Sequence, residues 1–504
     1  MICISLGNCS LRSVDARGRY RGFGGVHAPL SSMPELLKNL HLAVKSADII
    51  EIRADGIRDF SLPLLLKQKT SKPLIFTCYA KSNGGCFRGA VKERIKLLSS
   101  AITSGRFEYV TIDIPRLLAV SNNIKTLINL GRACQTKIIL AYHNHQKTPD
   151  NLEAIYKRLS MFNPNAIKIV TNAQNFSDNF KVFKLAQTLK LRRHHQPKLI
   201  AFCMGAKGMI SRILYKKFGL FLTYASYKTG WETADGQMPL SRMKYFYQAD
   251  SITCRTKIFG LLGSPIQHSY SPFLFNAWFG GEKTNAVYLP LAIDPNRFEE
   301  DFSLIKSFLN PMGFSITSPY KITAMKLADR LSNSAKEIGA INTIYCKDNK
   351  FIGTNTDWIG VIETLLPWRK LLKNRQALIL GQGGAARAII YALRYSGIKT
   401  IVFARKSNKN MLPLKRIAQY CRGSGYDKII INATPLGMMP DTDKSPIPQT
   451  YLKKGMIVFD TIYNPAETRL LRDAKKKGCV TINGLKMFLD QALKQMEYFN
   501  RSLP

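Results

Sequence analysis

A lysine lies in the middle of an otherwise apolar segment, AIKIV, in which Lys168 has isoleucine on both sides. Such a lysine is usually an edge or outward residue of a strand, and this alternative stays open here. Inside a buried cavity, loss of hydration would lower the pKa of the amine and leave it ready to attack a carbonyl group. Lys168 is therefore a candidate Schiff-base nucleophile.

Other ionisable side chains follow two more apolar segments. Glu51 and Arg53 are two positions apart in DIIEIRAD, so their side chains share one face of a strand. His143 and His145 share a face of KIILAYHNH for the same reason. The two histidines could be a metal pair, but no third ligand is evident.

A glycine-rich turn between residues 377 and 395 indicates a second kind of chemistry. The apolar residues ALIL lead into GQGGAA, at residues 381–386, and then into apolar residues at helical spacing. In such turns Gly381 would permit a tight turn, Gly383 would let the backbone approach a pyrophosphate, and small Ala386 would let the helix pack on the strand. The helix N-terminus would then favour phosphate. The pattern predicts a dinucleotide site, with an ordinary tight turn as the alternative.

Length and composition limit the class of protein. A chain of 504 residues is too long for one core, so two or three domains are expected. No apolar run approaches the roughly 18 residues that a membrane span requires, and the N-terminus lacks the basic region of a secretory signal. The ten cysteines show no paired spacing, which predicts reduced thiols and a cytoplasmic location.

The formal net charge of +41 has two interpretations. A basic chain is typical of nucleic-acid-binding proteins. Here, however, the cations are spread along the chain, and no basic block is longer than the run 475–477. We therefore expect small anionic ligands, with neither a nucleic acid nor a membrane as partner.

The first half must supply the strands that position Lys168 and the histidines. Helical patterns separate eight apolar segments, and this alternation predicts an α/β fold with a closed parallel (β/α)8 barrel. An open doubly wound sheet is the alternative. The active sites of such barrels lie at the carboxyl ends of the strands, where Glu51, His143 and Lys168 fall. The segments are 2–7, 48–55, 74–80, 109–115, 137–145, 166–170, 198–204 and 220–226.

The pattern restarts near residue 255 without a Gly/Ser-rich or Pro-rich linker. Small hydroxyl and amide residues then gather in turns, where such residues usually cap helices or form the turn. Lys321 and Asp357 are either a catalytic pair or a plain salt bridge, and their spacing does not decide between the two. We expect a barrel at 1–248, a substrate domain at 255–365 completed by a helix at 484–504, and a Rossmann-type domain at 372–482.

The motifs EIRADGI, AYHNHQKTP, AIKIV, MGAKGMISRI and ADGQMPL together resemble type I 3-dehydroquinate dehydratases, over roughly residues 1–245. The resemblance implies that Lys168 forms an imine with the ring ketone of 3-dehydroquinate. His143 would remove the neighbouring proton and later protonate the departing hydroxyl. The guanidinium of Arg212 would hold the substrate carboxylate. The other substrate-binding residues implied are Glu51, Arg53, Tyr79, Thr233 and Gln237.

Two residues of the first half depart from that family's pattern. Tyr79 stands where the family commonly has a substrate-binding arginine. Asn83 stands where the family has a glutamate that orients the histidine, and we expect its amide to hydrogen-bond the imidazole of His143 without supplying a charge. These departures affect efficiency more than the type of reaction.

The second half carries eight motifs in the order seen in shikimate dehydrogenases: GSPIQHSYSP, FSITSPYK, IGAINTIY, GTNTDWIG, GQGGAARA, INATPLGM, DTIYNP and NGLKMFLDQAL. The resemblance implies that Lys321 and Asp357 are the catalytic pair, with Lys321 handling the proton at the reacting oxygen. Ser315 replaces a commoner asparagine, and bulky Trp358 replaces a common glycine and is expected to narrow the site. The substrate-binding residues implied are Ser269, Ser271, Thr317, Asn342 and Gln491.

The choice of cofactor follows from charge at the end of the second strand of this domain. An NAD site normally places an acid about 20 residues beyond the glycines. Here TIVFA is followed by Arg405 and Lys406, which suit a 2′-phosphate. We therefore predict NADP as the cofactor and no metal. The other cofactor-binding residues expected are Gly381, Gly383, Gly384, Ala385, Thr434 and Gly484.

Together, the two resemblances predict a bifunctional enzyme of the shikimate pathway. Its first half would dehydrate 3-dehydroquinate, and its second half would reduce the 3-dehydroshikimate so formed with NADPH. A second half that acts on quinate, or a basic nucleic-acid-binding protein on an inactive enzyme scaffold, are the alternatives.

Overall fold

The computed structural model describes residues 1–7, 31–114, 121–191, 196–267, 269–405, 411–422 and 425–503. The chain divides into two compact units. The first comprises residues 1–256 together with 279–287 and 300–308, and the second comprises the remainder. The three domains predicted at 1–248, at 255–365 with 484–504, and at 372–482 stay a prediction.

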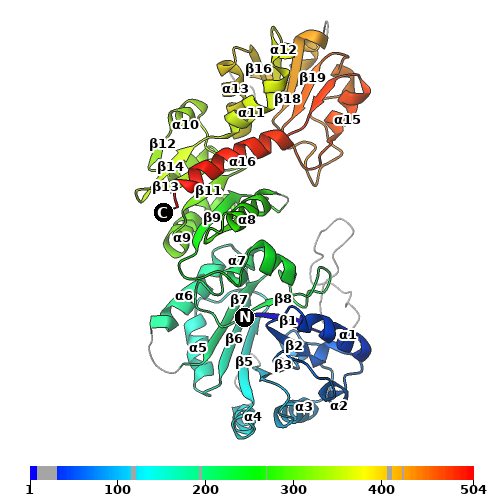
Figure 1. Ribbon diagram of the computed structural model, residues 1–504, viewed down its shortest axis with the longest axis vertical. Helices are drawn as coiled ribbons and strands as arrows, with labels where there is room; N and C mark the ends of the chain where they lie inside the picture. Colours follow the sequence, from blue (N-terminus) through cyan, green and yellow to red (C-terminus); the bar gives the residue numbers. More distant parts are fainter. Residues whose placement is uncertain are drawn as a thin grey trace. The chain divides into compact units, whose positions relative to one another are not determined.

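The first unit is a parallel barrel of eight strands, with helices outside them (Figure 1). Strand β1 pairs with both β2 and β8. At the remaining junction, Phe221 before β8 donates its N–H to the carbonyl of Leu199 in β7, at 2.8 Å. The predicted barrel is therefore confirmed, and the open sheet is wrong. The elements are β1 (Ile2–Leu6), α1 (Met33–Val44), β2 (Ile49–Arg53), α2 (Leu62–Leu66), β3 (Leu74–Thr77), α3 (Val91–Thr103), β4 (Tyr109–Asp113), α4 (Ser121–Ala133), β5 (Lys137–Asn144), α5 (Leu152–Ser160), β6 (Ala166–Asn172), α6 (Asp178–Leu191), β7 (Lys198–Met204), α7 (Met209–Ile213) and β8 (Thr223–Ala225).

Strand alternation explains why an apolar barrel carries a polar mouth. Side chains two positions apart share a face of a strand, so each strand sends alternate residues into the barrel. Two positions beyond Ile49 and Ala166, the same faces carry Glu51 and Lys168. The polar residues therefore rest on an apolar floor toward the carboxyl end of the strands. Residues of that floor are Cys3, Ile49, Ile75, Tyr109, Ile139, Ala166, Ile200 and Leu222.

The second unit contains a mixed sheet of six strands in the order β10-β9-β11-β13-β14-β12. Strand β11 pairs in parallel with β9 and antiparallel with β13. The elements are β9 (Lys257–Gly263), α8 (Ser271–Gly281), β10 (Ala286–Ala292), α9 (Phe298–Leu309), β11 (Gly313–Ile316), β12 (Arg330–Leu331), α10 (Asn333–Ile338), β13 (Thr343–Lys347), β14 (Lys350–Thr354) and α11 (Asp357–Leu365).

A second sheet in the same unit is parallel throughout, in the order β17-β16-β15-β18-β19-β20. Numbered from its own first strand, this order is 3-2-1-4-5-6, the doubly wound order of dinucleotide-binding folds. Helix α16 packs back on α11 and β13 of the mixed sheet. The elements are α12 (Arg369–Leu372), β15 (Gln376–Leu380), α13 (Gly384–Tyr395), β16 (Thr400–Ala404), β17 (Leu412–Pro413), α14 (Ile417–Tyr420), β18 (Lys428–Asn432), β19 (Ile457–Asp460), α15 (Arg469–Lys476), β20 (Val480–Ile482) and α16 (Leu485–Asn500).

The expectations about membrane-spanning helices and about cysteines can be compared with the structure. Among the helices described, none combines the length and the hydropathy that a membrane crossing needs. Eight cysteines are free thiols, whereas Cys86 is disulfide-bonded. The expectation of reduced thiols is therefore wrong at Cys86.

Candidate functional site

A cavity of about 620 Å³ opens at the carboxyl end of the barrel strands. It brings together residues from β2, the loop after β3, β5, β6, β7, α7, β8 and the loop after β8. Every residue that the sequence predicts for the dehydratase site lines it, namely Glu51, Arg53, Tyr79, His143, Lys168, Arg212, Thr233 and Gln237.

Lys168 lies inside this cavity rather than on an outer face of the barrel, and it is 4% exposed. Its Nζ donates to Glu51 Oε1 at 3.2 Å and to the Tyr79 hydroxyl at 3.0 Å. The ring of Tyr224 lies under the amine, 3.9 Å from its centroid. Burial lowers the pKa of Lys168, and the Glu51 carboxylate opposes that shift. The amine therefore has the environment that a nucleophilic lysine requires.

Glu51 collects hydrogen bonds from the wall of the barrel. Ser5 donates to its Oε2 at 2.7 Å, while Thr77 and Tyr224 donate to its Oε1 at 3.1 and 3.2 Å. Burial by itself raises the pKa of Glu51, but Lys168 and Arg53 outweigh it and hold that pKa below its ordinary value. The carboxylate is thus ionised and fixed beside the amine.

His143 stands beside Lys168 without a hydrogen bond to its Nδ1, which is buried among the described residues. Its ring meets the Tyr79 ring edge-on at 4.8 Å and stacks on His145 at 5.9 Å. Burial, with the neighbouring Lys168 and His145, lowers the pKa of His143 well below its ordinary value. The imidazole is therefore neutral and can accept a proton.

Asn83 does not orient His143, so that expectation is wrong. Its side-chain amide donates to Asp113 Oδ2 at 2.7 Å, and Asp113 also pairs with Arg94. A short amide finds a closer partner in this carboxylate than in the imidazole. Only the backbone carbonyl of Asn83 reaches a histidine, and that is His145, at 3.1 Å.

Arg212 is fully buried, yet its Nε and Nη1 have no hydrogen-bond partner within the described part of the chain. Its Nη2 donates to the carbonyl of Asp235 at 3.3 Å, and its guanidinium lies 4.2 Å from the ring of Phe202. Burial lowers the pKa of Arg212 to about 10. A buried cation with two unused donors suits a ligand carboxylate.

The guanidinium group of Arg53 is already paired with a carboxylate in this structure. It pairs with Asp55 through two hydrogen bonds of 3.0 and 2.7 Å and lies over the ring of Tyr79. Thr233 and Gln237 bond to each other, from the Thr233 N–H to Gln237 Oε1 at 2.7 Å. These residues line the cavity, and their partners hold their side chains in place.

A second cavity, of about 330 Å³, lies in the second unit. It joins residues from the mixed sheet, from α16 and from the glycine turn of the parallel sheet. The predicted residues that line it are Ser269, Ser271, Thr317, Lys321, Asn342, Asp357, Ala385, Thr434, Gly484 and Gln491.

Lys321 and Asp357 are in contact at the centre of this lining. Lys321 Nζ donates to Asp357 Oδ2 at 2.5 Å, and Asn342 donates to Asp357 Oδ1 at 2.8 Å. Asp357 begins α11, where the helix dipole favours a negative charge. The two side chains therefore form a hydrogen-bonded ion pair with little exposure, and its role in catalysis stays a prediction.

Asn342 also links the Lys321–Asp357 pair to the rest of the lining. Its amide donates to Gln491 Oε1 at 3.1 Å, and the N–H of Thr356 donates to its Oδ1 at 2.7 Å. In the same lining, Ser269 donates to Ser271 at 3.2 Å. These small polar groups form a constellation suited to a polyhydroxylated ligand.

The structure adds further residues to this cavity, and it places Trp358 elsewhere. Tyr463 and Gln495 line it, and Gln495 accepts a hydrogen bond from Ser315 at 2.7 Å. Tyr463 lies in the motif DTIYNP, so its neighbourhood was visible in the sequence. Trp358 packs instead on Tyr391 and Tyr395 of α13, with ring centroids 5.4 and 5.8 Å away. The expectation that Trp358 narrows the site is therefore wrong.

The glycine turn has the shape that a pyrophosphate site requires. Gly381 adopts φ 125°, and a Cβ there would lie 2.9 Å from the carbonyl oxygen of Ala433. A Cβ at Gly384, the first residue of α13, would lie 2.5 Å from the Cβ of Lys321. Beside Gly383 that space is open among the described residues. The turn therefore fits a dinucleotide and sets α13 close to Lys321.

The other predicted cofactor residues surround this turn in part. Thr434 donates to Asn432 Oδ1 at 2.7 Å, and Gly484 precedes α16. Arg405 follows β16 and is exposed. Lys406 lies outside the described residues.

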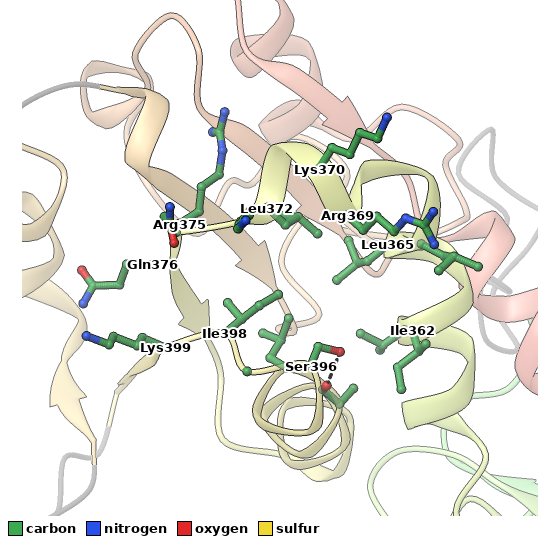
Figure 2. A pocket seen from close by; sticks show the side chains of 17 residues that line it. Ile362, Leu365, Arg369, Lys370, Leu372, Arg375, Gln376, Ser396, Ile398 and Lys399 are labelled. Carbon is green, nitrogen blue, oxygen red and sulfur yellow. Dashed lines mark hydrogen bonds between the residues drawn. The ribbon is translucent and has the colours of Figure 1, made fainter.

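A larger cavity, of about 730 Å³, lies at the opposite end of the parallel sheet (Figure 2). Its floor is apolar, with Leu372 and Ile398 facing it, while Lys370 and Lys399 point away from its centre. Arg375 donates to the carbonyls of residues 371, 428 and 455. These cations lie near the C-terminal ends of α11 and α13, where positive charge is favoured.

Two family models match the chain. Type I 3-dehydroquinase matches residues 26–253, and the shikimate dehydrogenase substrate binding domain matches residues 261–344. A shikimate dehydrogenase (NADP(+)) of Maridesulfovibrio salexigens is 38% identical over 248 residues, covering 47% of this chain and 89% of the relative. A solved shikimate 5-dehydrogenase of Thermus thermophilus, in complex with NADP(H) and shikimate, is 28% identical with a TM-score of 0.43 and covers 49% of this chain and 95% of its own.

One relative spans both halves. The chloroplastic bifunctional 3-dehydroquinate dehydratase/shikimate dehydrogenase of Arabidopsis thaliana is 30% identical over 486 residues, which cover 90% of this chain and 77% of the relative. The two family models match separate parts of the chain, and each unit holds its own polar cavity. The chain belongs to the family of bifunctional 3-dehydroquinate dehydratase/shikimate dehydrogenases.

Proposed function

We propose that the barrel cavity dehydrates 3-dehydroquinate through an imine on Lys168. The amine attacks the ring ketone, and loss of one water gives the imine. The imine acidifies the adjacent C–H, and His143 takes that proton. His143 then returns the proton to the departing hydroxyl, which leaves as water, and hydrolysis of the imine releases 3-dehydroshikimate and the free amine.

The observation that carries this proposal is the meeting of Lys168, His143 and Arg212 in one cavity. A buried amine, a neutral imidazole and a carboxylate-binding guanidinium are the groups that the mechanism needs. Borohydride added during turnover of 3-dehydroquinate tests it, because reduction of the imine leaves a stable adduct. Peptide mass analysis should locate that adduct on Lys168, and its absence or another location would refute the imine.

Protonation of His143 should reduce the dehydratase rate only well below pH 6.5, the ordinary pKa of histidine. Because burial lowers the pKa of His143, the neutral base persists above its folded-state pKa and is lost only as pH falls through that value. Measurement of kcat/KM against pH, with unfolding followed in parallel, checks this expectation. Because protonation of Lys168 would also lower kcat/KM, the inflection is assigned by NMR titration of the His143 ring, and a His143 pKa at or above 6.5 in folded enzyme would contradict the expectation.

We further propose that the second cavity reduces 3-dehydroshikimate to shikimate. Lys321, held by Asp357, is placed to give a proton to the carbonyl oxygen as it becomes a hydroxyl. Ser269, Ser271, Thr317, Asn342 and Gln491 would hold the hydroxyls and carboxylate. NADPH, when bound, supplies the hydride. Kinetics with shikimate and quinate measured side by side would show which of the two substrates this cavity prefers.

The choice of NADP over NAD rests on Arg405, which would pair with the 2′-phosphate at the end of β16. The relative from Maridesulfovibrio carries NADP(+) in its name, which supports the same choice. We expect Arg405→Ala to weaken NADPH binding by about ten- to a hundredfold, the range for a hydrogen-bonded charge pair. NADH binding should change less than twofold or so. Fluorescence titration of both cofactors checks this, and equal losses would refute the assignment.

The two reactions in one chain share an intermediate. Linking the sites raises the local concentration of 3-dehydroshikimate near the second cavity. The net charge of +41 suits the anionic substrates and the cofactor phosphates, and we propose no nucleic acid, membrane or metal as partner. The cytoplasmic location stays a proposal: the eight free cysteines among the described residues favour it, whereas the disulfide at Cys86 counts against it.

A further inference from the structure

Tyr79 touches both members of the proposed nucleophile and acid–base pair. Its hydroxyl lies 3.0 Å from Lys168 Nζ, and its ring meets the His143 ring edge-on, with centroids 4.8 Å apart and planes at 69°. From the family resemblance, the sequence predicts a substrate-binding residue at this position. The structure instead directs the hydroxyl at the amine.

Tyr79 is itself held rigidly. It is 3% exposed, and its backbone N–H donates to Asp55 Oδ1 at 3.1 Å. Arg53, which Asp55 also holds, covers the ring with its guanidinium 4.6 Å from the centroid. A side chain fixed by both its backbone and its face can fix a neighbour in turn.

The two acceptors around Lys168 determine where its lone pair points. A neutral amine has two N–H donors and one lone pair, and rotation about Cε–Nζ interchanges their directions. When the amine donates one N–H to Glu51 and the other to Tyr79, these two hydrogen bonds prevent that rotation. The lone pair, which must attack the ketone, then has a single remaining direction. Glu51 alone would leave the amine free to turn.

His143 has few other constraints among the described residues. Its Nδ1 is buried without a hydrogen bond, and Asn83, which stands where the family has an orienting glutamate, donates to Asp113 instead. The ring edge of Tyr79 and the face of His145 are the ring contacts that limit its rotation.

We infer that Tyr79 is a positioning residue that, together with Glu51, aims the lone pair of Lys168 and holds the His143 ring beside it. The inference rests on the imine mechanism proposed above. Burial raises the pKa of Tyr79 well above its ordinary value, so the group acts as a neutral hydroxyl. It can accept a hydrogen bond from the amine without adding a charge to the cavity.

Tyr79→Phe tests this role, because phenylalanine keeps the ring on His143 and removes the acceptor from Lys168. At saturating 3-dehydroquinate we expect the rate of borohydride-trapped adduct formation, and kcat with it, to fall about tenfold, the effect of one lost hydrogen bond. KM should stay within about twofold. Rates are normalised to the folded fraction, measured by near-UV circular dichroism.

Tyr109→Phe is the matched control, because Tyr109 is a buried barrel tyrosine of the apolar floor. It should trap adduct at the wild-type rate. Trapping by Tyr79→Phe as fast as wild type would overturn the inference. So would a tenfold rise in KM with unchanged trapping at saturation, since that result would make Tyr79 a substrate-binding residue. Failure of the wild type to form any adduct would refute the imine mechanism itself, which is a separate outcome.

Discussion

Replacement of Lys168 by alanine should lower the dehydratase kcat by about four orders of magnitude or more, the scale for loss of a covalent nucleophile. No other amine described in this cavity can form the imine, because Arg53 and Arg212 carry guanidinium groups. The assay is the formation of 3-dehydroshikimate from 3-dehydroquinate, with borohydride trapping in parallel. Oxidation of shikimate by NADP+ in the second cavity should keep its wild-type rate.

The alanine variant also leaves Glu51 buried without its ion pair, which costs about 3–5 kcal/mol in stability. Lys168→Gln separates chemistry from folding, because its amide can still donate to Glu51 but cannot form an imine. We expect this variant to be folded and equally inactive. Lys157→Ala, on the exposed surface of α5, should behave as wild type. Turnover by a folded Lys168→Gln protein would contradict the mechanism.

Replacement of Lys321 by alanine should lower the rate of 3-dehydroshikimate reduction by about 10² to 10⁴, the usual contribution of a general acid. Its Nζ is the proposed proton donor and the partner of Asp357, so the variant loses the donor and leaves this carboxylate without its ion pair. Dehydration of 3-dehydroquinate by the same protein should stay at the wild-type rate, because Lys168 and His143 lie in a different cavity.

Lys326→Ala is the matched control for Lys321, because it removes an exposed lysine five residues away that does not line the cavity as described. It should reduce 3-dehydroshikimate normally. Loss of both activities in Lys321→Ala would argue against two independent sites. Retention of reduction would remove Lys321 from the proposed mechanism.

Much of the fold follows from local patterns in the sequence. The alternation of apolar strands and helical patterns predicted the barrel, because each strand buries both faces and each helix covers one. Spacing by two residues predicted that Glu51 and Arg53 share a face, and the structure places both in the cavity. The glycine pattern predicted the turn at Gly381, where only a residue without a Cβ fits the positive φ.

The side-chain partners could not be predicted in the same way, because they depend on contacts between strands far apart in the chain. Asn83 bonds to Asp113, 30 residues away, rather than to His143. Trp358 was expected beside the substrate because of its position after Asp357, but helical geometry turns it about 100° away, onto Tyr391. Tyr79 and Lys168 are 89 residues apart in the sequence, and no local sequence pattern predicts their contact.

The central claim is that one chain converts 3-dehydroquinate to shikimate by two successive reactions. A coupled assay tests it most directly: the purified protein is given 3-dehydroquinate and NADPH only, and NADPH absorbance is followed. The account predicts that absorbance falls with wild-type protein, stays constant with Lys168→Gln alone, falls at least about a hundredfold more slowly with Lys321→Ala alone, and falls rapidly again when these two variants are mixed. Constant absorbance with wild-type protein that still oxidises shikimate would contradict the account.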